Sequence, residues 1–327
     1  MNILLTNTCN RKCAYCFAQE RVRYDLENET SGGVPEFISE ENFHTAIDFA
    51  ARSKQPQVGV LGGEPSLHPD FVDLLRYGWS KRIVTKVFTN GLWSENKIET
   101  LQKAIRDSKD KPRLQLVVNV NSPSTTSSNH QKMQARLFES LGRYATISFN
   151  ISRSEFDPGF LVDMINRYRT KRHIRLGIAQ PLSDLPNEYV DVAEYSSIVP
   201  SLMKLNDLCD ETSIQLGFDC GFTLCMFNAE DIGKFILSGT RFRATCGPAI
   251  DVGTDLSLWA CFPLSQLTRN LYMTDFDNIR QVRDYFKKRF TRLYRTGALR
   301  ECMSCRHRKR GQCSGGCAAH VYRGMHR

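Results

Sequence analysis

The sequence lacks the features of a secreted or membrane-anchored protein. It has no run approaching the roughly 18 uninterrupted apolar residues that a membrane-spanning helix needs. Its N-terminus has no basic segment followed by a long apolar stretch, so it carries no secretory signal. No internal repeat beyond a strand–helix period and no low-complexity tract is visible. We therefore expect a cytoplasmic chain in a reducing compartment, with no membrane partner.

The cysteines are the most informative residues that are present. Three of them form a Cys-x3-Cys-x2-Cys run at Cys9, Cys13 and Cys16. Three thiolates on one loop can hold three corners of a cubane iron–sulfur cluster, whereas most clusters take four protein ligands. One iron then stays open for a substrate or cofactor. Buried core cysteines and a zinc site are weaker interpretations, because the spacing is regular and no His lies nearby to complete a zinc site.

Together with the aromatic residue Tyr15, this run resembles the Cys-x3-Cys-x-aromatic-Cys motif of the radical S-adenosylmethionine (SAM) superfamily. The resemblance implies a [4Fe-4S] cluster whose open iron chelates the amino and carboxylate groups of SAM, with Tyr15 packed near the adenine. One electron from that cluster would then cleave SAM and release a 5′-deoxyadenosyl radical.

The hydrophobic pattern indicates alternating strands and helices. Helix spacing follows a Ser39 N-cap over 43–50 and recurs over 98–105 and 161–168. From the second strand on, strand starts are about 26 to 31 residues apart, which is the length of one βα unit and predicts a parallel sheet. Six units are too few for a closed barrel, so we predict an α/β fold with a (β/α)6 partial TIM barrel, which the resemblance also implies. The predicted strands are 3–6, 57–61, 83–88, 114–120, 145–151 and 174–179.

We expect three parts along the chain. The partial barrel spans residues 1–185, and a helical bridge spans 186–219 with a helix from about 190 to 212. A small, loop-rich, Cys-rich auxiliary-cluster domain spans 220–327. The chain begins directly at the first predicted strand, so any leader-peptide recognition is expected to use another surface or a separate leader-peptide-binding protein.

Glycine and polar segments follow the predicted strands, where sites form in parallel βα folds. The segment Gly62-Gly63-Glu64-Pro65 resembles the family segment that binds the amino group of the SAM methionine; the weaker alternative for Glu64 is a carboxylate at a helix start. Arg153 suits a carboxylate because its guanidinium binds in a bidentate manner. For the other strand ends, capping or core packing is the alternative to ligand contact. The further SAM contacts that the resemblance implies are Asn90, Asn119, Asn121, Asn150, Ser152, Arg153 and Ile178.

A second cysteine set lies downstream, and its segments resemble the SPASM domain. That domain accompanies radical SAM enzymes that modify peptides and proteins, and it usually carries two auxiliary four-iron clusters. By this resemblance, one cluster takes Cys246, Cys261 and Cys317, and the other takes Cys302, Cys305 and Cys313. The full set is Cys220, Cys225, Cys246, Cys261, Cys302, Cys305, Cys313 and Cys317.

The chain departs from the SPASM pattern at the fourth ligands. No cysteine follows Cys317, and the nearest cysteines before Cys246 are Cys225 and Cys220. We expect these two to complete the two clusters, one each, with the pairing open. An auxiliary cluster with an open iron, a single auxiliary cluster, a zinc ribbon of the last four cysteines and free thiols are the alternatives. Cys209, on a predicted helix, is expected to be a core residue.

The formal net charge of +9 does not by itself indicate nucleic-acid binding. Thiolate-bound clusters are anionic, and three of them would remove about five units of charge. The mildly basic remainder is weak evidence for an acidic partner. The basic run at 306–310 is interpreted as a solvated face that also offsets cluster charge, although it can bind RNA or an acidic peptide.

The resemblance implies a radical SAM enzyme that takes hydrogen from a peptide or protein. The product is a thioether, carbon–carbon or ether crosslink, or an oxidised residue, in peptide natural-product (RiPP) maturation. Its partners are the peptide or protein substrate and an external electron donor of the flavodoxin or ferredoxin type. Alternatives are sulfatase-maturing-type oxidation, a small-molecule radical SAM dehydrogenase, and, in another class, a non-catalytic iron–sulfur or zinc protein for electron transfer or RNA binding. The sequence identifies no catalytic proton donor or acceptor.

Overall fold

One curved sheet organises the computed structural model, which describes residues 1–21, 36–108, 112–183 and 185–325. The strand order is β7-β6-β5-β4-β3-β2-β1-β8-β9. Neighbours from β7 to β8 run parallel, and β9 pairs with β8 in an antiparallel hairpin. The partial barrel with a parallel sheet is therefore confirmed. The strands are β1 (Asn2–Leu4), β2 (Gln57–Leu61), β3 (Val84–Thr89), β4 (Leu114–Asn119), β5 (Ala145–Ile151), β6 (His173–Ile178), β7 (Gln215–Phe218), β8 (Ile250–Val252) and β9 (Leu258–Ala260).

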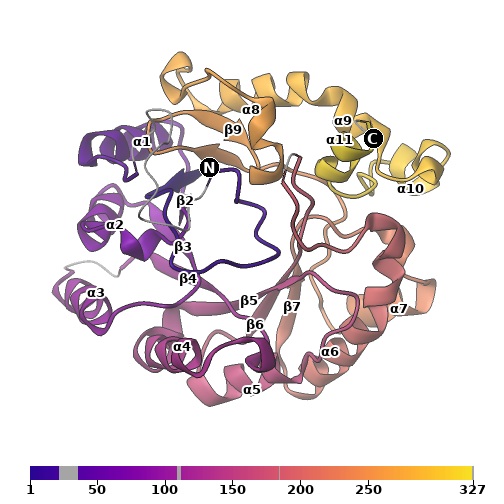
Figure 1. The fold of residues 1–327 in the computed structure, drawn as a ribbon, viewed down its shortest axis with the longest axis horizontal. Helices are drawn as coiled ribbons and strands as arrows, with labels where there is room; N and C mark the ends of the chain where they lie inside the picture. The colour runs from indigo at the N-terminus through magenta and orange to yellow at the C-terminus, as the bar shows by residue number, and fades with distance from the viewer. Residues whose placement is uncertain (22–35, 109–111, 184, 326–327) are drawn as a thin grey trace.

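Helices cover the outer face of the sheet, as Figure 1 shows for the first six. The predicted cap is present, because the Ser39 side chain accepts a hydrogen bond from the backbone N–H of Asn42. Such caps satisfy backbone donors that the first turn leaves free. The helices are α1 (Glu40–Arg52), α2 (Phe71–Ser80), α3 (Glu95–Asp107), α4 (Ser128–Leu141), α5 (Gly159–Tyr168), α6 (Val199–Glu211), α7 (Ala229–Leu237), α8 (Ile279–Arg289), α9 (Thr291–Thr296), α10 (Arg306–Lys309) and α11 (Ala318–Met325).

The strands separate a dry face from a polar one. In β3, Thr85, Val87 and Thr89 are buried, whereas Lys86 and Phe88 keep partial exposure. Successive side chains of a strand point to opposite faces, so one set packs under the helices and the other lines the inside of the curved sheet. The strand-lining residues are therefore the ones available to a ligand.

The sheet continues beyond the predicted barrel boundary at residue 185. The predicted helix at 190–212 is present as a 3-10 segment (Val192–Ile198) followed by α6. The expected helical bridge, however, also contains β7, which pairs in parallel with β6. A strand of four residues that includes a glycine is too short for hydrophobic alternation to reveal.

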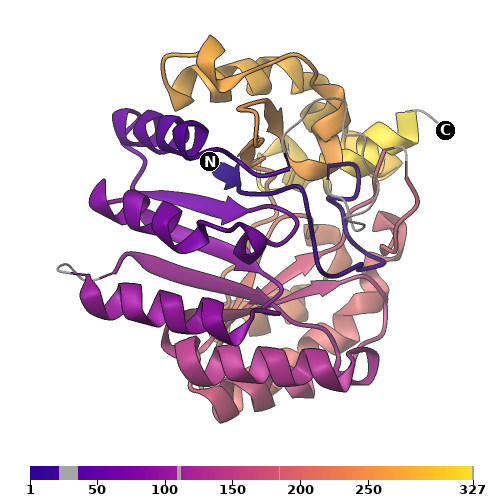
Figure 2. The same cartoon turned by 60° about the vertical axis from the view of Figure 1, so that its left-hand side comes forward.

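The C-terminal part of the chain returns to the first strand. Strand β8 pairs with β1, and the backbone N–H of Ile279 in α8 donates to the Ser53 hydroxyl at the end of α1. Figure 2 shows α8 running above α1 on that side. In the part of the chain that the structure describes, no helix has both the length and the apolar character to cross a membrane.

Candidate functional site

The three N-terminal cysteines lie on the loop that follows β1, across the carboxyl ends of the strands (Figure 1). Burial, and then the charges of Glu64, Cys13 and Cys16, raise the pKa of the Cys9 thiol to about 12. Burial also raises the pKa of Cys13, with Cys16 adding to it and Arg11 opposing it. The three sulfurs are thus close enough for their negative charges to repel one another. A cationic iron–sulfur core relieves that repulsion, so this donor set fits such a cluster.

The described residues contain no group of three or more His, Cys, Asp or Glu side chains placed around a single metal ion. Each cysteine of a four-iron cluster binds a different iron, so cluster ligands stand farther apart than the ligands of one ion. The spacing of these cysteines therefore fits the ligands of a four-iron cluster better than the ligands of one metal ion.

The two glycines after β2 pack against the cysteine loop. A Cβ on Gly62 would lie 2.5 Å from the Thr6 carbonyl oxygen. A Cβ on Gly63 would overlap the Thr8 carbonyl and approach the Cys9 Cβ to 2.8 Å. The backbone N–H of Gly63 donates to the Thr6 carbonyl at 3.0 Å. These glycines are required for the close approach of two loops, in addition to any approach to a ligand.

Glu64 is completely buried, and both of its carboxylate oxygens accept hydrogen bonds within the protein. Oε1 accepts from the Ser66 backbone N–H at 3.2 Å and hydroxyl at 2.7 Å, from the Thr89 hydroxyl at 2.7 Å, and from Trp93 Nε1 at 3.2 Å. Oε2 accepts from the Asn90 backbone N–H at 2.8 Å. Burial raises the pKa of this carboxyl, and these donors act in the opposite direction. Glu64 therefore ties the end of β3 to the loop after β2. Its neighbour Pro65, also buried, begins a short 3-10 turn.

The predicted asparagines form one network around Tyr15. Asn119 Nδ2 donates to the Tyr15 hydroxyl at 2.8 Å, and Asn150 Nδ2 donates to Asn119 Oδ1 at 3.1 Å. The Asn121 amide also reaches the Tyr15 hydroxyl, and with its oxygen turned outward it accepts from Arg11 Nη2 at 2.8 Å. The strand ends of β4 and β5 thereby hold Tyr15 in one position beside the cysteines.

Four other predicted SAM contacts lie outside this network. Asn90 Nδ2 donates to Asn10 Oδ1 at 2.8 Å and approaches the Cys9 sulfur at 3.9 Å, so it touches the cysteine loop. Arg153 is exposed and pairs with Glu188 at 3.2 Å. Ser152 is half-buried next to it, and Ile178 belongs to the hydrophobic core.

The structure adds an ion pair inside the barrel that the sequence analysis missed. Arg175 of β6 pairs with Asp219 just after β7, donates to the Ser148 hydroxyl at 3.0 Å, and lies over the Phe88 ring at 5.5 Å. Arg175 also acts electrostatically on Cys220. Alternation back from Gly177 would have pointed Arg175 inward, once β6 was known to have one face inside the barrel.

The downstream cysteines form two groups. In the first, burial raises the pKa of Cys261 well above its usual range, and the charges of Cys220, Cys246 and Cys317 raise it further. Tyr294 lies beside Cys246, Cys261 and Cys317, whose charges add to the burial that raises its own pKa. Cys220 keeps an exposed side-chain surface, yet protein atoms surround its thiol closely enough for burial to raise its pKa to about 12.

The second group includes Cys302, Cys313 and Cys225. Burial raises the pKa of Cys302, as do the charges of Cys225 and Cys313, while a backbone N–H and Arg308 lower it. The backbone N–H of Gly315 donates to the Cys313 sulfur at 3.3 Å. Amide donors to sulfur and a nearby guanidinium both stabilise anionic clusters, so this donor set also fits a cluster. Cys305 lies three residues along from Cys302, at the start of α10.

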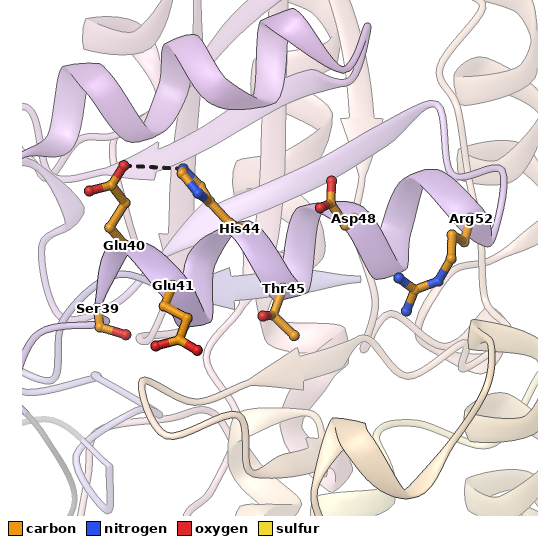
Figure 3. A pocket seen from close by; sticks show the side chains of 7 residues that line it. All are labelled: Ser39, Glu40, Glu41, His44, Thr45, Asp48 and Arg52. Carbon is orange, nitrogen blue, oxygen red and sulfur yellow. Dashed lines mark ion pairs between the residues drawn. The ribbon is translucent and has the colours of Figure 1, made fainter.

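Surface hollows occur both beside the cysteine loop and away from it. One lies over α1 and contains no predicted site residue; Figure 3 shows its Glu40–His44 ion pair, 3.7 Å apart. The other is lined by Lys12, Cys13 and Ala14 of the cysteine loop together with the segment 186–188. The second hollow therefore borders the proposed site and the first does not.

The family profile of the Radical SAM superfamily matches residues 3–177, which contain the cysteine loop, the glycine pair and the asparagine network. The chain belongs to the radical SAM superfamily. As a radical SAM enzyme it uses a [4Fe-4S] cluster and SAM. Among curated relatives, it is 32% identical over 87 residues to the Fe-coproporphyrin III synthase of Methanosarcina barkeri, and 30% identical over 98 residues to the sporulation killing factor maturation protein SkfB of Bacillus subtilis. These matches cover 27% and 30% of this chain, and only 20% and 22% of those proteins.

Solved structures of SuiB and anSMEcpe match the chain over nearly its whole length. SuiB of Streptococcus suis, bound to its precursor peptide SuiA, superposes with a TM-score of 0.68 at 16% identity, covering 98% of this chain and 72% of that one. The enzyme anSMEcpe with bound AdoMet superposes with a TM-score of 0.65 at 16% identity, covering 97% and 88%. At these identities the likeness concerns the fold, and it includes the cysteine-rich C-terminal region.

Proposed function

We propose that the chain is a peptide- or protein-modifying radical SAM enzyme whose product is a crosslink or an oxidised residue. The observation that carries the proposal is that two groups of cysteines flank one barrel. The first follows β1, and the second includes Cys220 at the end of β7, next to the Arg175–Asp219 pair. A substrate inside the curved sheet would lie between them. The likeness of the fold to SuiB, solved with a precursor peptide, supports a peptide substrate.

The first site would hold its cofactors through the loops after β1 and β2. Cys9, Cys13 and Cys16 are the proposed cluster ligands, and the backbone of Gly62 and Gly63 is the proposed contact for the SAM methionine. When bound, the cluster supplies the electron that cleaves SAM and so yields the radical that removes hydrogen from the substrate. The protein's own contribution is orientation and exclusion of water.

The side chains around that site have separable tasks. Asn119 and Asn121 hold the Tyr15 ring, and Asn150 holds Asn119, so the ring presents a fixed face for an adenine. Glu64 would act through its position, because all its contacts are to protein groups. Contact of Arg153 with a SAM carboxylate requires its exposed ion pair with Glu188 to open.

The C-terminal region, residues 220–327, is proposed as a SPASM-like domain with two auxiliary clusters that take up or pass on electrons. An external flavodoxin- or ferredoxin-type donor is the proposed partner. The exposed Arg306, Lys309 and Arg310 follow Cys305 directly and would attract such acidic proteins. Free thiols at all these positions suit a cytoplasmic, reducing environment.

The test is anaerobic reconstitution with iron and sulfide, reduction with dithionite, and measurement of 5′-deoxyadenosine formed from SAM. We expect turnover with the wild type and with Cys209→Ala, and none with Cys13→Ala. Any short peptide found encoded beside the gene is the substrate to co-express, and mass spectrometry should then show that it has lost two hydrogen atoms. A well-reconstituted wild type that forms no 5′-deoxyadenosine would refute the enzymatic proposal.

A small-molecule substrate is the second candidate. The observation in its favour is the 32% identity to a protein named for the synthesis of Fe-coproporphyrin III. This candidate predicts 5′-deoxyadenosine formation that no neighbouring peptide stimulates and no mass change in any such peptide.

A further inference from the structure

The loop that follows β7 decides which auxiliary site each of Cys220 and Cys225 joins. That loop carries both Cys220 and Cys225, on either side of a glycine and a short hydrophobic stretch. Cys220 is coupled electrostatically to Cys246, and both act on Cys317, so these residues lie together. The cysteines without a fourth partner are then Cys302, Cys305 and Cys313, called here the C-terminal cysteine group.

Cys209 is not available for this role. It lies in α6 with 2% of its surface exposed, inside the hydrophobic core. Burial alone raises its pKa to about 12, and no other cysteine contributes. Of the twelve cysteines in the sequence, Cys225 is then the one left to complete the C-terminal cysteine group.

The residues around Cys225 pack against the segments that carry the C-terminal cysteine group. Its thiol donates to the Thr223 hydroxyl at 3.5 Å. The Thr223 methyl group lies 3.7 Å, and the Ala298 Cβ 3.4 Å, from the position that a Cβ on Gly316 would take. The backbone N–H of Ala298 in turn donates to the Gly315 carbonyl at 2.8 Å. The loop after β7 therefore packs on the two glycine turns at 297–298 and 315–316.

The same two turns lie against the Cys302 sulfur. A Cβ on Gly297 would lie 3.0 Å from the Cys302 sulfur and 2.9 Å from Arg308 Nε. A Cβ on Gly315 would lie 2.8 Å from the Cys302 sulfur. Arg308 Nε is buried and has no hydrogen-bond partner among the described residues. A donor held in this way beside Cys302 suits an anionic group of sulfur atoms at that point.

We propose that Cys225 is the fourth protein ligand of a four-iron cluster, and that its partners are Cys302, Cys305 and Cys313. Cys220 then completes the site of Cys246, Cys261 and Cys317. The inference rests on the auxiliary clusters of the proposed function. Four thiolates leave no iron of the Cys225 cluster open, so this cluster binds no substrate. One short loop at the end of β7 would fix both clusters to the barrel.

Metal content and spectroscopy test the assignment without a substrate. The variants are Cys225→Ala, Cys225→Ser and the buried control Cys209→Ala, each purified anaerobically and reconstituted in the same way. Wild type and Cys209→Ala should hold about twelve irons per chain. Cys225→Ala should hold about eight, or keep the cluster with one iron that binds added cyanide and changes the electron paramagnetic resonance signal. The signal of the first cluster with SAM should be unchanged in both Cys225 variants, which shows that they fold.

Two results would overturn the assignment, and they are distinguishable. If Cys225→Ala and Cys225→Ser match Cys209→Ala in iron, sulfide and spectrum while the wild type holds about twelve irons, only the ligand assignment is wrong. If the wild type itself reaches only about four irons, the auxiliary clusters of the proposed function fail together with it.

Discussion

Replacing Glu64 by Gln is the most direct test of how the site is built. The change keeps shape and removes one acceptor oxygen from a carboxylate that receives five protein hydrogen bonds. In the better orientation the amide oxygen keeps the four bonds of Oε1, and the new amide N–H groups face the Asn90 backbone N–H. A hydrogen bond to a charged group contributes about 1.5–3 kcal/mol, and the remaining bonds weaken when the charge is lost. Removing a buried charge offsets part of the lost hydrogen-bond energy, so we expect the free energy of unfolding to fall by about 2–4 kcal/mol.

The measurement is the apparent melting temperature of the reconstituted protein at a fixed scan rate, with Glu139→Gln as control. Glu139 is an exposed glutamate on α4, so the control makes the same charge change without the buried contacts. At about 2 °C per kcal/mol for a chain of this size, Glu64→Gln should melt roughly 4–8 °C below the control. At a temperature where both are folded, their SAM affinities should agree within a few-fold. Unchanged melting with lost SAM binding would refute the reasoning and make the carboxylate a direct ligand.

Three further predictions concern other parts of the molecule. Gly63→Ala should lower the free energy of unfolding by about 1–3 kcal/mol and lower the iron content of the first cluster, because the added Cβ meets the Thr8 backbone. Gly233→Ala, which has open space around it, should change neither quantity. Melting temperature and iron content are the measurements. Burial raises the pKa of Asp251 to about 6, so the folded protein favours the protonated carboxyl. This contribution to the free energy of unfolding is complete below about pH 4 and is lost as the pH rises through 6, a decrease of about 3 kcal/mol. Asp251→Asn should therefore gain stability relative to wild type above pH 6, and parallel melting curves across pH would contradict this. Tyr294→Phe removes a buried hydroxyl that has no hydrogen-bond partner in the described ranges; redox titration should show a lower potential for the neighbouring cluster and no change for the first.

The barrel was predictable because its βα units are regular. Strand starts recur at one βα length, and the predicted ranges at 57–61 and 145–151 coincide with β2 and β5. Strand β7 was missed because four residues carry too little alternation, and β8 because its partner, β1, is almost 250 residues away. Pairing across such a separation leaves no local signal in the sequence.

The candidate site was predictable in its residue types and less so in their contacts. Spacing alone brought out Cys9, Cys13 and Cys16 as one group. The same spacing gave no indication that Glu64 is enclosed by protein donors or that Arg153 is paired with Glu188 at the surface. Arg175 carried no motif, because its position inside the barrel depends on which face of β6 is covered.

The sequence by itself determined the first cysteine loop, the glycine pair and the total number of thiols, because ligand spacing within a loop is a local property. Only the tertiary structure decided which distant thiols come together. Cys220 and Cys225 are five positions apart on one loop, yet Cys220 lies with Cys246 and Cys225 with Cys302. The physical reason is that the loop after β7 packs against two separate returns of the chain, and chain folding, not sequence distance, sets which sulfurs are neighbours.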